Sequence, residues 1–237
     1  EWMDSFASFY QKQHCEPDFV MMNLYTVDDT PQSIQRRQPA GIMQQRDAVY
    51  DVIRRILNNN EDCGWKVRTW YVAEWNYDLG WNNALQDTMF YPAYIVKSMV
   101  DCWQTGIAFG VMDPLENVSE DQMIQGSFQG KRGIFTYDFI KKPSYYVYEV
   151  LARMGSYFIK KGENYLITKS EDGEIQILLY NYLHLSEAYC QRKLDQNEIS
   201  PGMLEPEHDL TYEICLEHAK ERTYLKATSV LNENNGN

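Results

Sequence analysis

The sequence predicts a parallel α/β fold followed by a small antiparallel β region, and two patterns support this. Short apolar runs alternate with amphipathic helical stripes as far as Gly155, which is typical of strands and helices in a parallel sheet. Beyond Gly155 the pattern changes to a two-residue alternation, which is typical of antiparallel strands. We therefore expect two domains, residues 1–155 and residues 156–237.

Three strand–helix units follow one another in the first region. The run DFVMMNLY is almost continuously apolar, as expected for a strand buried on both faces. Pro143 marks the first turn of a helix, because proline fits that position, and the run of three asparagines at Asn58 to Asn60 is expected to end another helix. The expected strands are residues 18–25, 66–73 and 106–112, and the expected helices are residues 46–57, 90–102 and 143–154.

The second region carries hairpin and strand signals. Residues 164–169 and 174–180 flank Glu171-Asp172-Gly173, and Asp-Gly between two apolar runs is a strong signal for a β-hairpin. Apolar and polar residues then alternate over residues 210–217, and residues 224–231 supply a further expected strand. We expect these strands to form a small β-sandwich.

Charge and hydrophobicity narrow the class of protein. The chain has 237 residues, of which 44% are hydrophobic, so it is long enough to bury a sizeable core. Its formal net charge of -12 repels phosphate backbones, so we expect no nucleic-acid partner for these residues. No apolar run reaches the roughly 18 residues of a membrane helix, and the first residues do not resemble a signal peptide. A membrane partner is therefore not expected.

The cysteines and histidines indicate neither a disulfide framework nor a metal site. Five scattered cysteines form no Cys-x-x-Cys pair, which favours reduced thiols and a cytoplasmic location. The four histidines lack His-Glu-x-x-His or similar ligand spacing. We expect no metal and no other cofactor.

One carboxylate, Glu74, stands out by its position. It follows an apolar strand in the segment VAEWN, and in a parallel barrel the carboxyl end of each strand faces the catalytic site. A retaining glycosidase uses one ionised carboxylate as the nucleophile and a second, about 5 Å away, as the acid/base. On its own, however, a glutamate at a strand end is more often a solvated cap or a salt-bridge partner.

Several segments, taken in order along the chain, resemble glycoside hydrolase family 39, which includes β-xylosidases and α-L-iduronidases. Glu74-Trp75-Asn76 stands where a strand of that family ends in Glu-Trp-Asn, with the glutamate as nucleophile. Asp87 to Met99 resembles the helix after the nucleophile loop, and Phe128 to Gly155 resembles the long loop and the last barrel helix. Within that last segment, Ile140 to Tyr146 (IKKPSYY) is the most specific piece. The likeness covers nearly the whole chain.

The resemblance implies a fold, an activity and a set of site residues. The fold would be the C-terminal part of a (β/α)8 TIM barrel followed by a β-sandwich, and the ligand a xyloside or a related small carbohydrate. Glu74 would be the nucleophile, and Tyr25 would hold its carboxylate, because the family's preceding strand ends in His-x-Tyr and this one ends in Asn23-Leu24-Tyr25. Trp75 and Trp81 would line the sugar subsite, since aromatic rings stack on sugars. The other expected substrate-binding residues are Asn23, Asn76, Asp113 and Glu116, the last two matching the family with a one-residue gap.

The chain also departs from the family pattern. The family's acid/base, the glutamate of an Asn-Glu-Pro motif, has no counterpart in this sequence, and the loop that reads His-Gly-Gly-Phe-Gly in the family reads Gln129-Gly130-Lys131-Arg132-Gly133 here. These losses leave a second reading open. Similar domains occur in transcription regulators of the AraC type, where such a domain would sense a sugar without hydrolysing it.

A barrel reduced to its last three strands has a physical consequence. The inner faces and the edges of those strands lack their neighbours, which leaves apolar surface exposed. We therefore expect this part of the molecule to be unstable alone, and to be completed by further chain toward the N-terminus or by association of copies through the exposed edge.

Overall fold

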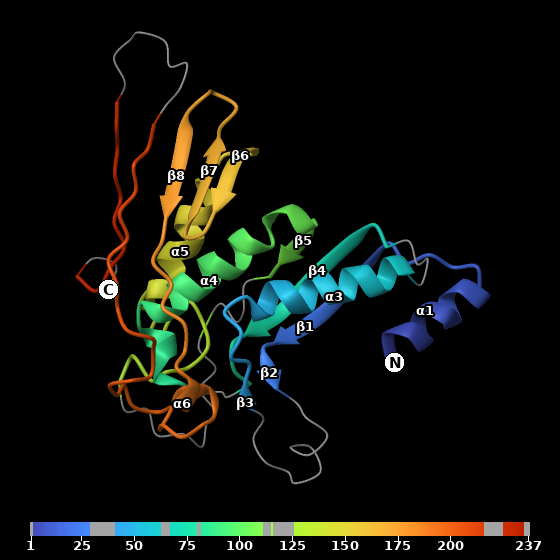
Figure 1. Ribbon diagram of the computed structural model, residues 1–237, viewed down its shortest axis with the longest axis horizontal. Coiled ribbons are helices and arrows are strands. Elements are labelled where there is room, and N and C mark those ends of the chain that lie inside the picture. Colours follow the sequence, from blue (N-terminus) through green and yellow to red (C-terminus); the bar gives the residue numbers. More distant parts are fainter. Residues whose placement is uncertain are drawn as a thin grey trace.

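The computed structural model describes residues 2–28, 41–62, 67–79, 82–110, 115, 126–215 and 225–234. Figure 1 shows a parallel sheet with helices at one end of the chain and an antiparallel sheet at the other. In chain order the elements are α1 (Trp2–Lys12), β1 (Phe19–Tyr25), β2 (Val27–Asp28), β3 (Gly41–Ile42), α3 (Ala48–Asp62), β4 (Thr69–Asn76), the 3₁₀ helix η1 (Ala84–Asp87), α4 (Phe90–Asp101), the 3₁₀ helix η2 (Trp103–Thr105), β5 (Ile107–Phe109), α5 (Pro143–Ala152), β6 (Tyr157–Gly162), β7 (Tyr165–Lys169), β8 (Ile175–Leu179) and α6 (Glu187–Cys190).

The three predicted strands and three predicted helices of the first region are all present, with shifted ends. Helix α3 continues through Asn58 to Asn60 as far as Asp62, so the predicted stop is wrong. Asparagine is only a moderately poor helix former and does not by itself end a helix.

Helix α1 was not predicted. It packs Ala7 against Trp70 of β4 in a small second apolar cluster.

Strands β1, β4 and β5 form a parallel sheet in the order β1-β4-β5. Helices α3 and α4 cover one face of it, as Figure 1 shows. Ile53 of α3 and Ile95 of α4 join Val72 of β4 in the main core, and all three side chains are at most 1% exposed. The parallel α/β arrangement predicted from the alternating pattern is therefore confirmed.

The opposite face of this sheet carries large exposed side chains. Phe19, Met21 and Tyr71 are 54%, 60% and 38% exposed, and the rings of Phe19 and Tyr71 meet edge to face with centroids 5.8 Å apart. This is the uncovered inner strand surface expected from the sequence. It is also the face from which Glu74 projects.

A β-bulge in β4 sets the direction of Glu74. Met22 pairs with Val72, but Leu24 pairs with Trp75, so Ala73 and Glu74 together lie opposite the single residue Asn23 of β1. The extra residue reverses the alternation of side chains along the strand. Trp75 consequently turns into the core at 1% exposure, while Glu74 is exposed on the open face.

Gly110 packs directly against this bulge. Its backbone N–H donates to the Val72 carbonyl at 2.7 Å, and its own carbonyl accepts a hydrogen bond from the Trp75 indole at 2.9 Å. A Cβ atom at this position would lie 2.8 Å from the Ala73 carbonyl oxygen, closer than van der Waals contact permits. Glycine is therefore required here for space.

Gly110→Ala is expected to lower the free energy of unfolding by about 1–3 kcal/mol, because the backbone of the bulge must move. Denaturant unfolding of the full chain measures the change. Gly41→Ala is the matched control, since a Cβ there would meet its nearest atom, the Cys190 carbonyl oxygen, at an ordinary 3.4 Å. Equal stabilities for the two variants would contradict the role given to Gly110.

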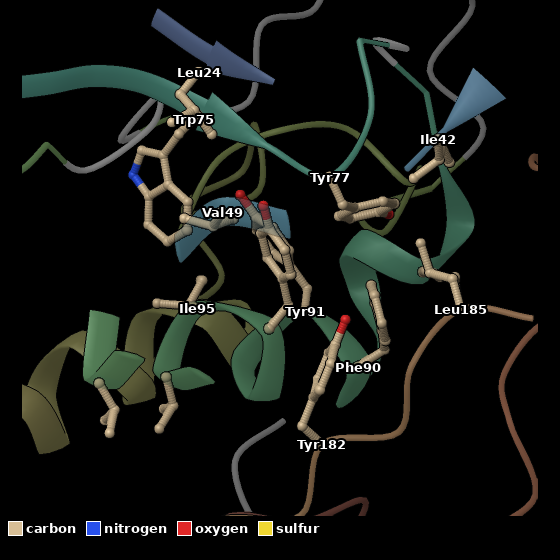
Figure 2. Packing of buried hydrophobic residues seen from close by; sticks show 14 of the residues in the cluster. Leu24, Ile42, Val49, Trp75, Tyr77, Phe90, Tyr91, Ile95, Tyr182 and Leu185 are labelled. Carbon is tan, nitrogen blue, oxygen red and sulfur yellow. The ribbon is translucent and has the colours of Figure 1, made fainter. Parts of the chain in front are cut away.

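The main core is rich in aromatic rings and draws on both regions of the chain. Figure 2 shows Trp75 and Tyr77 from β4 and its following loop, Phe90 from α4, and Tyr182 from beyond β8. The Tyr77 and Phe90 rings meet edge to face at 5.1 Å, and the Phe90 and Tyr182 rings lie 5.9 Å apart. Residues on both sides of position 155 thus share one buried cluster, and the division into two domains at that point stays a prediction.

Polar contacts join the same two regions. The Arg46 guanidinium donates to the Tyr182 carbonyl at 2.6 Å. His184 Nε2 lies 2.9 Å from the Gln44 carbonyl oxygen, and its Nδ1 lies 2.8 Å from the Tyr182 hydroxyl. Because a carbonyl can only accept, Nε2 carries the proton and Nδ1 accepts from the tyrosine. Burial lowers the pKa of His184, which favours this neutral form.

The second region contains the predicted hairpin. Strands β7 and β8 pair in antiparallel fashion across the turn at Glu171 to Gly173, and β6 completes a three-stranded sheet on the other side of β7. Gly173 has a positive φ of 87°, a conformation that suits glycine, and this explains the Asp-Gly signal.

The predicted strand at residues 210–217 does not form a strand over its described part, and neither do residues 225–231 of the segment predicted at 224–231. Figure 1 shows this C-terminal segment running beside β8. Tyr212 bonds to the Asn164 carbonyl through its hydroxyl at 3.3 Å rather than through a backbone ladder. Alternating apolar residues therefore marked an extended segment but not a paired one. Within the residues described, the antiparallel sheet has three strands, and the predicted sandwich with a second sheet is not seen.

Candidate functional site

The site is centred on Glu74 at the carboxyl end of β4. The Tyr25 hydroxyl, at the end of the neighbouring strand β1, donates a hydrogen bond to Glu74 Oε2 at 2.9 Å. The two strands end side by side because they are parallel, and Tyr25 pairs with Asn76 in the register. Partial burial, followed by the hydrogen bond to Glu74, raises the pKa of Tyr25, while the nearby positive charge of Arg132 acts in the opposite direction. Tyr25 is thus a neutral donor to the carboxylate.

Arg132 reaches this pair from the long loop between β5 and α5. Its Nη1 donates to the Tyr25 hydroxyl at 3.2 Å, and its guanidinium carbon lies 5.1 Å from the centre of the Tyr25 ring. Its Nη2 lies 2.6 Å from the Leu79 carbonyl and 3.3 Å from the Asp78 carbonyl, in the loop that follows β4. Although charged, Arg132 is only 5% exposed.

The loop after β4 is held by a second arginine. Asp78 is fully buried, and both of its carboxylate oxygens contact the Arg192 guanidinium, at 2.5 and 3.3 Å. Asn83 Nδ2 also lies 3.3 Å from the Asp78 carboxylate. Two-point contact between arginine and a carboxylate fixes orientation as well as charge. The chain immediately beyond the strand that carries Glu74 is therefore anchored to the second region.

A buried ion pair anchors the loop that carries Arg132. Lys142 Nζ lies 2.6 Å from Asp87 Oδ1 and 2.5 Å from the Lys131 carbonyl, and the Lys142 side chain is fully buried. The other Asp87 oxygen accepts the Gly130 N–H at 2.5 Å. The loop is thus tied to η1 at two points on either side of Arg132.

The structure places only some of the predicted site residues on the open face beside Glu74. Asn23 is exposed opposite the bulge, on the same face as Glu74. Asn76 is fully buried, and its side-chain oxygen accepts the Tyr77 N–H at 2.9 Å, so it shapes the turn after β4. Trp75 packs against Phe109 and Tyr94 in the core, and its ring is not available to a sugar. Trp81, Asp113 and Glu116 lie outside the described residues.

Sequence reasoning identified Tyr25 and Glu74 but not the arginines beside them. Arg132 was noted only as part of a loop that had lost a histidine and an aromatic residue. No local pattern marks Arg192, which lies 114 residues from the aspartate it contacts. The Lys142–Asp87 pair joins two of the segments that resemble the family, Asp87 to Met99 and Phe128 to Gly155.

The described part of the chain offers neither a metal site nor a membrane-spanning helix. No group of three or more His, Cys, Asp or Glu side chains there is arranged to hold a metal ion. None of the helices described combines the length and apolar character needed to cross a bilayer.

Parallel strands backed by helices, with a carboxylate exposed where one strand ends, form the arrangement in which parallel α/β barrels place their active sites. Residues 1–200 match the model of the Glycosyl hydrolases family 39. The chain belongs to this family.

Solved structures show a similar fold. A monomeric β-xylosidase from Caulobacter crescentus is 21% identical, with a TM-score of 0.62 over 78% of this chain and 37% of that one. A GH39 enzyme from Xanthomonas axonopodis pv. citri is 16% identical, with a TM-score of 0.61 over 77% and 36% of the two chains. A further structure of a GH39 β-xylosidase from Caulobacter crescentus is 18% identical, with a TM-score of 0.56 over 78% and 36%. The chain thus spans a little over a third of the length of the structures it matches.

Proposed function

We propose that this chain carries the nucleophile of a retaining glycosidase, Glu74, and that the substrate is a β-xyloside or a closely related sugar. The observation that carries the proposal is the contact between Glu74 and Tyr25. A carboxylate exposed at a strand end would otherwise be expected to sit in water, whereas this one accepts a 2.9 Å hydrogen bond from a tyrosine that is itself contacted by a buried arginine.

The geometry suits a nucleophile. The Tyr25 hydroxyl engages Oε2, which orients the carboxylate and leaves Oε1 to approach the anomeric carbon. In the first step a bond forms between Glu74 and that carbon while the bond to the leaving oxygen breaks, which gives a glycosyl-enzyme ester. In the second step water attacks the same carbon, gives up a proton to the acid/base partner acting as a general base, and releases the sugar and the free Glu74 carboxylate. Asn23, Trp81, Asp113 and Glu116 are the proposed sugar contacts.

A second carboxylate must protonate natural leaving groups. It is not needed when the leaving group is a stable anion such as dinitrophenolate. A substrate of this kind therefore tests the role of Glu74 separately from that of any acid/base partner.

We also propose a division into two domains. The barrel region, residues 1–155, carries the nucleophile, and residues 156–237 form an additional β domain that contacts the barrel region through Arg192.

The proposal is tested with dinitrophenyl 2-fluoro-β-xyloside and the full chain. Fluorine at C2 slows the second step by destabilising the positive charge that develops on the sugar, so the covalent intermediate should accumulate. We expect release of one equivalent of dinitrophenolate, and mass spectrometry of peptic peptides should place the fluorosugar on Glu74. A label on another residue, or no label at all, would refute the assignment.

A sensor domain of the kind found in AraC-type regulators is the second candidate. One difference from the family favours this candidate. The family's loop reads His-Gly-Gly-Phe-Gly, whereas the corresponding loop of this chain lacks the histidine and the aromatic ring and places Arg132 beside Tyr25 instead. A sensor would release no dinitrophenolate in the trapping experiment. It would still bind xylose, which calorimetry would measure.

A further inference from the structure

Arg132 has a defined place beside the proposed nucleophile. The Arg132 side chain is almost completely buried, yet it comes from a loop 58 residues after Glu74, and it contacts the end of β1 and the loop that follows β4. Burying an arginine is costly unless its N–H groups are used. Those described here lie against the Tyr25 hydroxyl and against the carbonyls of Asp78 and Leu79.

The contact with Tyr25 is directional. The Tyr25 oxygen accepts from Arg132 and its hydrogen is donated to Glu74 Oε2, so the three groups form one chain of hydrogen bonds. A donor bonded to the oxygen of a hydroxyl makes that hydroxyl a stronger donor in turn. The positive charge of Arg132 also lowers the pKa of Tyr25, against the effect of burial. Both effects strengthen the hydrogen bond that orients Glu74.

The remaining contacts fix where Arg132 lies. Its second nitrogen joins the Leu79 carbonyl, and the neighbouring Asp78 is held by Arg192, so the loop after β4 forms a rigid seat for the guanidinium. The Lys142–Asp87 pair in turn holds the loop from which Arg132 projects. Because both its backbone and its guanidinium are held, the Arg132 side chain can keep Tyr25 in a single orientation.

We propose that Arg132 is a positioning residue that acts on the nucleophile through Tyr25. This inference rests on the proposed function of Glu74 and adds a residue that its assignment does not require. Arg132 does not touch Glu74 in any contact described here. Its expected effect is on the rate of the covalent step rather than on sugar binding.

The first test measures trapping by dinitrophenyl 2-fluoro-β-xyloside in the full chain. Arg132→Gln should slow trapping at saturating reagent by about 10–100-fold, since misorienting a reacting group by about 1 Å can cost 100-fold. The concentration for half-maximal rate should change much less, and the final amount of label should stay at one equivalent. Arg132→Lys should fall in between, because lysine keeps the charge but lacks the planar fork.

Two controls separate positioning from folding. Arg153→Gln removes the same charge from an exposed helix position, where the arginine side chain is 65% exposed, and should leave trapping unchanged. A misfolded Arg132 variant would lower the final amount of label rather than the rate of labelling.

Tyr25→Phe and the Tyr25→Phe/Arg132→Gln double variant complete a double-mutant cycle. If Arg132 acts through Tyr25, the double variant should be about as slow as the slower single variant. Multiplied effects would overturn the proposal.

A measurement that needs no reaction keeps the two proposals distinguishable. In protein labelled with ¹³C at tyrosine Cζ, the Tyr25 signal is the one lost in Tyr25→Phe. Arg132→Gln should shift this signal at neutral pH and move its titration to higher pH, because a charge that lowers the pKa has been removed. If the signal shifts but Glu74 is never labelled, the positioning link stands and the nucleophile assignment fails. If the signal does not move, the link itself is wrong.

Discussion

Glu74→Gln is expected to lower the release of dinitrophenolate from dinitrophenyl β-xyloside by about 10⁴-fold or more, since losing a nucleophile removes the covalent route entirely. An amide cannot form the ester intermediate. The hydrogen bond from Tyr25 can be kept, because the glutamine oxygen still accepts. The fold should therefore survive, and a loss of this size would be chemical. Steady-state absorbance of the phenolate provides the measurement.

Two controls make the Glu74 result decisive. Glu171→Gln makes the same change in an exposed hairpin turn and should leave the rate unaltered. Glu74→Ala should recover turnover in the presence of azide, which can enter the space left by the side chain and attack the anomeric carbon. The product would then be a xylosyl azide of inverted configuration. A Glu74→Gln variant that retains the parent rate would rule out the nucleophile.

Asp87→Asn is expected to lower the free energy of unfolding by about 3–5 kcal/mol, since it removes a carboxylate that pairs with the fully buried Lys142 ammonium. The Lys142 side chain is fully buried, so solvent screens this pair much less than an exposed one. The pair connects η1 to the start of α5 across the loop that carries Arg132. Denaturant unfolding followed by tryptophan fluorescence measures the change.

The comparison for this second prediction is an exposed ion pair. Glu149 of α5 and Arg153, the residue directly after α5, lie 2.6 Å apart, with side chains 40% and 65% exposed. Glu149→Gln should cost less than about 1 kcal/mol, because solvent screens that pair. If the two variants lose similar amounts of stability, the buried pair does not anchor the loop as described.

The fold was largely predictable because its signals are local. The apolar stripe of α4, Pro143 at the start of α5 and the Asp-Gly of the β7–β8 hairpin each follow from neighbouring residues. The extended segment after His208 was misread as a strand because alternation does not show whether a backbone partner is near. Helix α1 was missed although its apolar face packs on Trp70.

The candidate site was predictable only where it lies within one motif. Glu74 and Tyr25 stand at strand ends, and strand ends can be read from sequence. Trp75 was expected at the sugar because it adjoins Glu74, but the bulge turns it inward. Arg132 and Arg192 reach the site from distant loops, so their positions depend on tertiary packing that no short pattern records.

The additional residue in β4 also affects how tolerance to substitution should vary along that strand. A mutational scan that measures folding stability ought to show a phase shift: apolar replacements accepted at positions 70 and 72 and then at position 75, with polar ones accepted at 71 and 74. Deleting Ala73 would remove the bulge and restore strict alternation, with the acidic group still facing outward and the indole still facing the helices, because Val72 would then be followed directly by Glu74. The bulge thus accommodates one additional residue while Glu74 and Trp75 keep the directions that a shorter, regular strand would give them.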